Sequence, residues 1–183
     1  VLERARKSGF DTTNVKEMLS DLYLKNGNPE KAFEITTDEL TKVKCLLDMD
    51  KKDEAIQKLN QMEDQYSHIA QFHSLKAQYY YMTGDYDKAL ECVAKFDELE
   101  KNSPLTYQMR ALIYEEKNDD YNAHINWGKY NLVRGNKDIA INEYLNAYQL
   151  KNDDLELLNT LAMLLEESGD KNHAMEFYEK ISK

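Results

Sequence analysis

Hydrophobic residues recur every three to four positions along almost the whole chain, which is the spacing of helices that bury one face. The stretch from Ala77 to Leu99 shows this most clearly, because two such runs flank the residues Thr83, Gly84 and Asp85. Gly84 can adopt the left-handed conformation that ends a helix, and Asp85 can cap the next one. The stretch therefore predicts two antiparallel helices joined by a tight turn.

The same arrangement recurs, because an alanine follows each predicted turn inside an apolar run. These alanines are Ala32, Ala55, Ala89, Ala123, Ala140 and Ala174, separated by 23, 34, 34, 17 and 34 residues. Helices are expected over residues 12–25, 29–35, 40–49, 53–62, 69–82, 86–99, 105–116, 121–134, 137–150, 155–167 and 171–181. Residues 1–9 are expected to form the last turns of a further helix that ends at Gly9.

Two intervals depart from the regular spacing. A new capping signal, residues 36–39, follows soon after Pro29, so either a shortened helix or a single bent helix accounts for the 23-residue interval. The helix at 121–134 follows a turn as a second helix should, and precedes Gly135 as a first helix should. It either plays both parts or marks a unit with one half missing.

The three intervals of 34 residues, with Gly27, Gly84, Gly135 and Gly169 at turns, resemble the tetratricopeptide repeat (TPR) family over nearly the whole chain. The resemblance implies an all-α fold, a TPR-type solenoid of helical hairpins with a right-handed superhelix, irregular near residues 29–38 and 120–135. We expect a single array over residues 1–183, about five to six hairpins with some incomplete. We also expect the chain to be a fragment of a longer protein.

The chain is acidic, with a formal net charge of −10 and a pI near 4.9. Such a charge repels phosphate backbones, so nucleic acid is not an expected partner. No apolar run reaches membrane-spanning length, and membrane insertion is not expected. Cys45 and Cys92 lie within apolar helical patterns and are predicted to be buried thiols. Free thiols favour the cytoplasm, although the sequence leaves the compartment unknown.

No residue pattern points to catalysis, a metal or a cofactor. His68, His73, His124 and His173 lack the spacing of a metal site on one helix, and the glycines are isolated at helix ends. The paired carboxylates fall near helix ends, where acidic residues stabilise the helix dipole or contact solvent. The protein is therefore not expected to be an enzyme.

The resemblance does imply a binding face. TPR proteins commonly bind an extended peptide or a partner helix along a concave face lined by their first helices. The matching positions here are Gln71, Ser74, Gln78, Tyr81, Gln108, Leu112, Lys129, Asn159 and Met163. Amide side chains suit this role because each can donate to and accept from a peptide backbone. One TPR subclass binds the carboxylate tail of heat-shock chaperones with a set of lysine, asparagine and arginine side chains, and this set is incomplete here.

Two classes of function follow. The first is a protein–protein interaction scaffold that binds a peptide or partner helix in the concave groove within a multi-protein assembly. The alternative is a structural spacer or self-assembly segment, and thus a possible homo-oligomer, without a groove ligand. A third hypothesis is a regulatory module of an attached enzyme.

Overall fold

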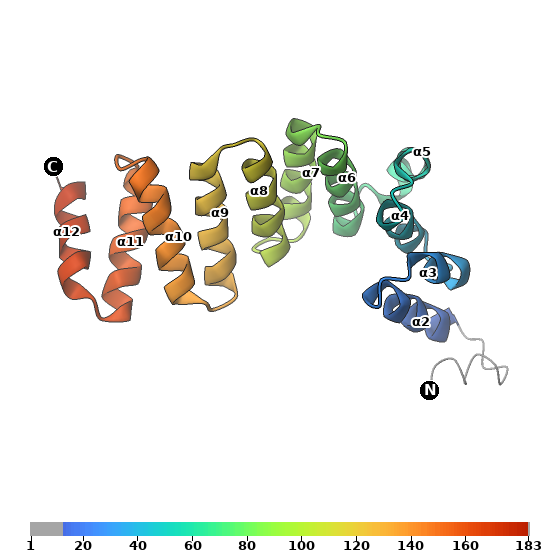
Figure 1. The fold of residues 1–183 in the computed structure, drawn as a ribbon, viewed down its shortest axis with the longest axis horizontal. Coiled ribbons are helices and arrows are strands. Elements are labelled where there is room, and N and C mark those ends of the chain that lie inside the picture. The colour runs from blue at the N-terminus through green and yellow to red at the C-terminus, as the bar shows by residue number, and fades with distance from the viewer. Residues whose placement is uncertain (1–12, 183) are drawn as a thin grey trace. The chain divides into compact units, whose positions relative to one another are not determined.

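The protein is described by a computed structural model that covers residues 13–182. Every regular element in this range is an α-helix (Figure 1). The helices are α2 (Thr13–Lys25), α3 (Pro29–Ile35), α4 (Glu39–Asp48), α5 (Lys52–Tyr66), α6 (Ala70–Met82), α7 (Tyr86–Leu99), α8 (Pro104–Glu116), α9 (Asp120–Val133), α10 (Lys137–Leu150), α11 (Leu155–Ser168) and α12 (Lys171–Ile181). The all-α prediction is confirmed, whereas the helix expected over residues 1–9 lies outside the described residues.

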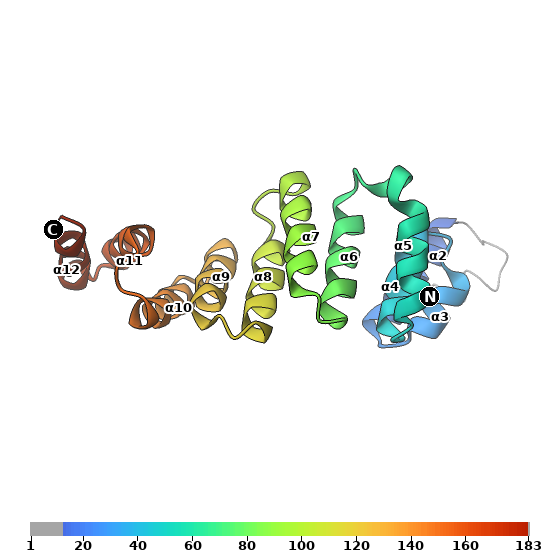
Figure 2. The ribbon, with the colours of Figure 1, turned by 90° about the horizontal axis from the view of Figure 1, so that it is seen from above.

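The chain divides into two compact units, Val1–Leu99 and Glu100–Lys183, and each is described here by itself. That both belong to one array over residues 1–183 stays a prediction. Within each unit, consecutive helices contact one another, and Figures 1 and 2 show α6 with α7, α8 with α9, and α11 with α12 as antiparallel pairs. This stacking of helical hairpins is the solenoid arrangement that the repeat pattern predicts.

The core of the first unit lies where α6 packs against both α4 and α5. It is built from side chains that are almost completely buried: Leu40, Val43, Leu46, Leu47, Ala55, Leu59, Met62, Phe72 and Leu75. Tyr66 packs against this cluster, so α5 continues to Tyr66 rather than ending at Met62 as the sequence pattern predicted.

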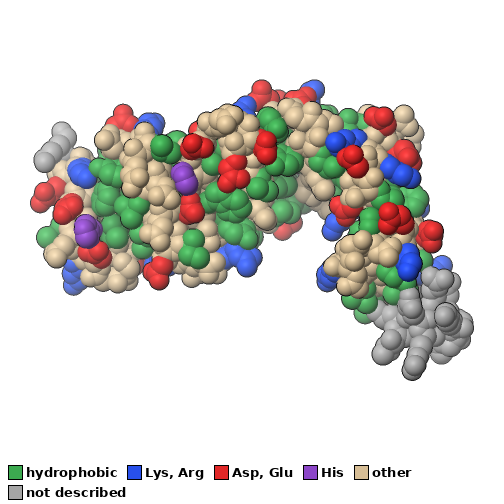
Figure 3. All heavy atoms as spheres, in the orientation of Figure 1, with side chains coloured by type: hydrophobic (Ala, Val, Ile, Leu, Met, Phe, Trp, Pro, Cys, Tyr) green, Lys and Arg blue, Asp and Glu red, His purple; other side chains and the backbone are tan. Residues whose placement is uncertain are grey.

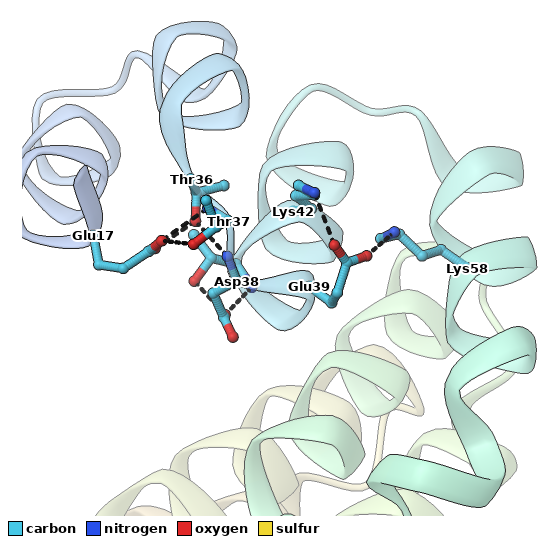
Figure 4. A network of polar contacts seen from close by, with 8 residues as sticks. Glu17, Thr36, Thr37, Asp38, Glu39, Lys42 and Lys58 are labelled. Carbon is cyan, nitrogen blue, oxygen red and sulfur yellow. Dashed lines mark hydrogen bonds and ion pairs between the residues drawn. The ribbon is translucent and has the colours of Figure 1, made fainter. Parts of the chain in front are cut away.

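A network of polar contacts explains the short helix in the first unit (Figure 4). The Thr36 hydroxyl donates to Glu17 Oε2 at 2.5 Å, and the Thr37 N–H donates to Glu17 Oε1 at 2.8 Å. Asp38 then caps α4 by accepting from the Thr41 N–H at 2.7 Å. Because Glu17 and Asp38 satisfy backbone and hydroxyl groups on both sides of the break, α3 ends after seven residues. A shortened helix is therefore correct, and the single bent helix is wrong.

In the second unit, α9 packs along both α8 and α10. It thus serves as the second helix of one hairpin and the first helix of the next. Two polar residues become buried on it, Asn126 and Asn131. Their side-chain amides donate to the carbonyls of Asn122 (2.8 Å) and Trp127 (2.9 Å), one turn earlier, so the buried amide N–H groups are satisfied.

The rest of the second unit has a conventional apolar core between α10, α11 and α12. Its buried members include Ala140, Tyr144, Leu158, Leu161 and Phe177. Gly128 on α9 lies directly against the ring of Tyr144, and a Cβ at this position would be 2.6 Å from Tyr144 Cε1. The glycine therefore allows α9 and the Tyr144 ring to approach closely.

Candidate functional site

A pocket of about 210 Å³ opens in the second unit between α9 and α11. Most of the lining residues lie on one face of α9 and on the first turns of α11. One further lining residue comes from α10, and one comes from the loop between α10 and α11. The lining residues are Tyr121, Asn122, Ile125, Lys129, Tyr144, Asp154, Glu156, Leu157 and Thr160. The pocket therefore combines apolar and aromatic walls with charges of both signs.

Asp154 ties the two sides of the pocket together. Its carboxylate caps α11 by accepting from the N–H groups of Glu156 (2.9 Å) and Leu157 (3.2 Å), and it also accepts from the Tyr121 hydroxyl at 2.6 Å. The hydrogen bond from Tyr121, together with those from the backbone, holds the pKa of Asp154 below its ordinary value. Asp154 is thus an ionised, fully engaged group that fixes the start of α11 beside the start of α9.

Tyr144 reaches the pocket from α10 and is only 2% exposed. Burial, followed by smaller contributions from Tyr107 and from the negative charge of Glu156, raises the pKa of Tyr144 well above the ordinary value, so the phenol is neutral. Within residues 13–182, the buried side-chain atoms without a hydrogen-bond partner are His73 Nδ1 and Thr106 Oγ1, and the Tyr144 hydroxyl is not one of them. Tyr144 lines a cavity that a ligand can enter.

Lys129 and Glu156 face each other across the pocket. Their Nζ and Oε1 atoms are 3.9 Å apart, and their side chains are 42% and 84% exposed. A loose, exposed ion pair of this kind contributes little to stability. Both charges are therefore accessible to a bound molecule.

The residues that the sequence predicted for the binding face lie on four helices. In the first unit, α6 carries Gln71, Ser74, Gln78 and Tyr81, of which Gln71 is exposed and the others are half-buried. The Ser74 hydroxyl donates to the Gln71 carbonyl of its own helix at 2.9 Å. The Tyr81 ring lies 6.1 Å from that of Tyr86, between centroids.

In the second unit, Gln108 and Leu112 are half-buried on α8, and Asn159 and Met163 are exposed on α11. Lys129 is the one predicted residue that lines the pocket. Asn159 and Met163 follow Glu156 at intervals of three and seven residues, so they continue the same face of α11. The predicted role of the whole set in binding stays a prediction.

Sequence reasoning missed most of the pocket. Tyr121, Tyr144, Asp154 and Thr160 were not predicted to bind a partner, because each also fits a simpler role as a core or capping residue. The signal for Asp154 was present, since an aspartate directly before an apolar run indicates a helix cap. Nothing in the spacing indicated that Tyr121 and Asp154, 33 residues apart, would meet.

The described residues offer few other sites. Within residues 13–182, no group of three or more His, Cys, Asp or Glu side chains is placed to hold a metal ion. Over the same range, no helix combines the length and the apolar character needed to cross a bilayer. Cys45 and Cys92 are free, buried thiols, as predicted.

The sequence model of the tetratricopeptide repeat family matches residues 155–183, the segment that contains α11 and α12. Among solved structures, TTC0263, a thermophilic TPR protein of Thermus thermophilus, superposes with a TM-score of 0.54 at 12% identity, over 84% of this chain and 99% of that one. Residues 155–183 thus match the tetratricopeptide repeat family, and the chain as a whole has the fold of TPR proteins.

A second solved structure similar to this chain is that of the human IFIT1 dimer with PPP-AAAA. It has a TM-score of 0.54 and 16% identity, and the match covers 98% of this chain and 57% of that one. No curated protein matches the sequence. At these identities the likeness shows the fold, and the TPR fold in general is a scaffold for protein–protein interaction.

Proposed function

We propose that this chain binds an extended segment or a helix of a partner protein along the face that α9 and α11 form. The observation that carries the proposal is the pocket of about 210 Å³ with the phenol of Tyr144 in its wall. On α11, Glu156, Asn159 and Met163 continue the pocket as an exposed face. A partner that fills the pocket and lies along this face would form hydrogen bonds with the polar lining residues and cover exposed apolar surface.

Two further helix faces that carry amide side chains are proposed to contact a partner, each within its own unit: that of α8 in the second unit and that of α6 in the first. Gln108 and Leu112 lie four residues apart on α8, and Gln71, Ser74, Gln78 and Tyr81 recur along α6 at helical spacing. Side chains of both charges are interspersed along α8 to α12 on the surface drawn in Figure 3. Such a surface favours recognition by specific hydrogen bonds and pockets over attraction to one strongly charged partner.

Affinity capture from the source cell tests the proposal. The full chain is immobilised as wild type, as Asn159→Ala/Met163→Ala on the proposed face, as the pair Gln78→Ala/Gln108→Ala, and as Lys171→Ala/Glu179→Ala on α12 as the control. We expect the first pair to remove captured proteins that the control retains, and the second pair to weaken their capture. All variants should keep the circular dichroism of the wild type, because these positions are exposed or half-buried.

Capture of the same proteins in equal amounts by all variants would contradict the proposal. Light scattering over a range of concentrations tests the alternative of self-assembly. A mass that rises with concentration, together with capture insensitive to the variants, would favour the spacer or self-assembly function instead.

A further inference from the structure

We propose that the pocket between α9 and α11 receives a basic side chain of the partner, an arginine, as its anchoring residue. This inference rests on the proposed function, since it names the chemistry of the partner segment at the same site. It depends on the size of the pocket, its charges and the phenol of Tyr144.

The size of the pocket limits the occupant. Pockets for drug-sized ligands measure about 300–1,000 Å³. At about 210 Å³, this pocket is too small for such a ligand and suits one large side chain. Ile125 and Leu157 provide apolar walls, against which the aliphatic part of an arginine side chain can pack.

The charges of the lining favour a cation. Asp154 and Glu156 carry two negative charges, and Lys129 carries one positive charge. The carboxylate of Asp154 is already engaged by Tyr121 and by the start of α11, whereas that of Glu156 is 84% exposed and only 3.9 Å from Lys129 Nζ. Glu156 is therefore the carboxylate that an incoming cation can bind. An acidic side chain would meet repulsion from both carboxylates in the same small volume.

The phenol of Tyr144 distinguishes arginine from other cations. Tyr144 lines the pocket together with Glu156, and a phenol oxygen can accept a hydrogen bond. A guanidinium carries five donors in a rigid planar arrangement and can donate to two different acceptors at once. One guanidinium can thus donate to Glu156 and to Tyr144 together, while a lysine ammonium is a strongly hydrated point charge.

Peptide titration followed by NMR tests the inference on the full chain. The probes are the tripeptide acetyl-Gly-Arg-Gly-amide and two matched peptides with citrulline or glutamate in place of arginine. Citrulline keeps the shape of arginine without its charge. We expect the arginine peptide to shift the amide signals of Lys129, Leu157 and Thr160 saturably, in the millimolar range expected for two charge-assisted hydrogen bonds. The citrulline peptide should bind about tenfold more weakly, and the glutamate peptide more weakly still.

Variants assign the binding to named groups. Glu156→Gln should weaken the arginine peptide by about tenfold, and Tyr144→Phe should weaken it by several-fold with the fold intact. Glu179→Gln, which removes the same charge from an exposed site on α12, should leave binding unchanged. Lys129→Gln should strengthen binding, because it removes the competing cation.

Three results would each overturn the inference: equal affinity for the arginine and citrulline peptides, no effect of Glu156→Gln, or no saturable shift of the pocket amides up to about 10 mM peptide. A glutamate peptide that binds best, and that Lys129→Gln weakens, would assign the pocket to an acidic partner instead. If partner capture depends on the α11 face but the arginine peptide fails, this inference falls and the proposed function stands. If the arginine peptide binds but the Asn159→Ala/Met163→Ala variant captures the same proteins as the wild type, the proposed function is wrong.

Discussion

Replacement of Gly128 by alanine should destabilise the second unit, although the same change normally stabilises a helix. In a helix interior, alanine is favoured over glycine by about 1 kcal/mol. Here the new Cβ would lie 2.6 Å from Tyr144 Cε1 and 2.7 Å from Cζ, whereas carbon atoms in contact are about 3.5–4.0 Å apart. The Tyr144 ring is 2% exposed and packed in the core of the second unit, which limits how far it can shift to relieve the overlap.

Overpacking of this kind typically costs 1–3 kcal/mol, and a rigid ring against a helix backbone belongs at the upper end. A cost of about 3 kcal/mol, reduced by about 1 kcal/mol of helix propensity, leaves a net loss of about 2 kcal/mol for Gly128→Ala. Urea denaturation measures it, followed by the fluorescence of Trp127. This is the one tryptophan in the sequence, and it lies next to the substitution.

The control is the same substitution in a Tyr144→Leu background. Without the ring, Gly128→Ala should become neutral or stabilising, so the two changes should be coupled by about 2 kcal/mol. A stabilising effect of Gly128→Ala in the wild-type background would refute the reasoning. So would an equal loss in both backgrounds, because the loss would then not arise from contact with Tyr144.

Three further predictions concern single groups. Although partial burial alone would raise it, hydrogen bonds from Thr36 and Thr37 hold the pKa of Glu17 below 4.5. The ionised Glu17 therefore stabilises the fold fully at pH values above the pKa that this residue has in the unfolded chain, and this contribution is lost as the pH falls through its lower pKa in the folded protein. Glu17→Gln should accordingly make the melting temperature less dependent on pH below about 5. Thr106 is fully buried, and within the described residues its hydroxyl has no hydrogen-bond partner, so Thr106→Val should gain about 1 kcal/mol in urea denaturation; a loss would contradict this. Burial raises the pKa of the Cys45 thiol from 9.0 to about 11. At pH 8, Cys45 should therefore react with a thiol reagent at least about a hundredfold more slowly in the native protein than in the urea-unfolded protein. Equal rates would show that the reagent and solvent reach Cys45 in the native protein.

The helices could be predicted from sequence because their limits are encoded locally. Gly84, Gly135 and Gly169 all adopt positive φ at the turns, as the pattern indicated. Asp50, Asn102 and Asn118 adopt the same left-handed conformation without glycine. Aspartate and asparagine tolerate it better than other residues, and polar residues around them had already indicated a turn.

The pocket could not be predicted because it depends on which helices become neighbours in space. The apolar pattern of α10 identified Tyr144 as a core residue, which it is by burial, but could not show that it also lines a pocket. Glu156 resembled any acidic residue in a first helical turn. Lys129 was predicted for the binding face through its match to the family, and the structure places it in the pocket.

The helix with a double role, α9, forms one side of the pocket. A helix that packs on two sides must bury two faces, and in α9 this burial includes Asn126, Asn131 and Gly128. Gly128 lets the Tyr144 ring lie against the α9 backbone, and Tyr144 lines the pocket together with one face of α9. That face carries Tyr121, Ile125 and Lys129 at intervals of four residues, and the start of α11 lies opposite it. The pocket thus lies along the helix that begins the 17-residue interval between Ala123 and Ala140.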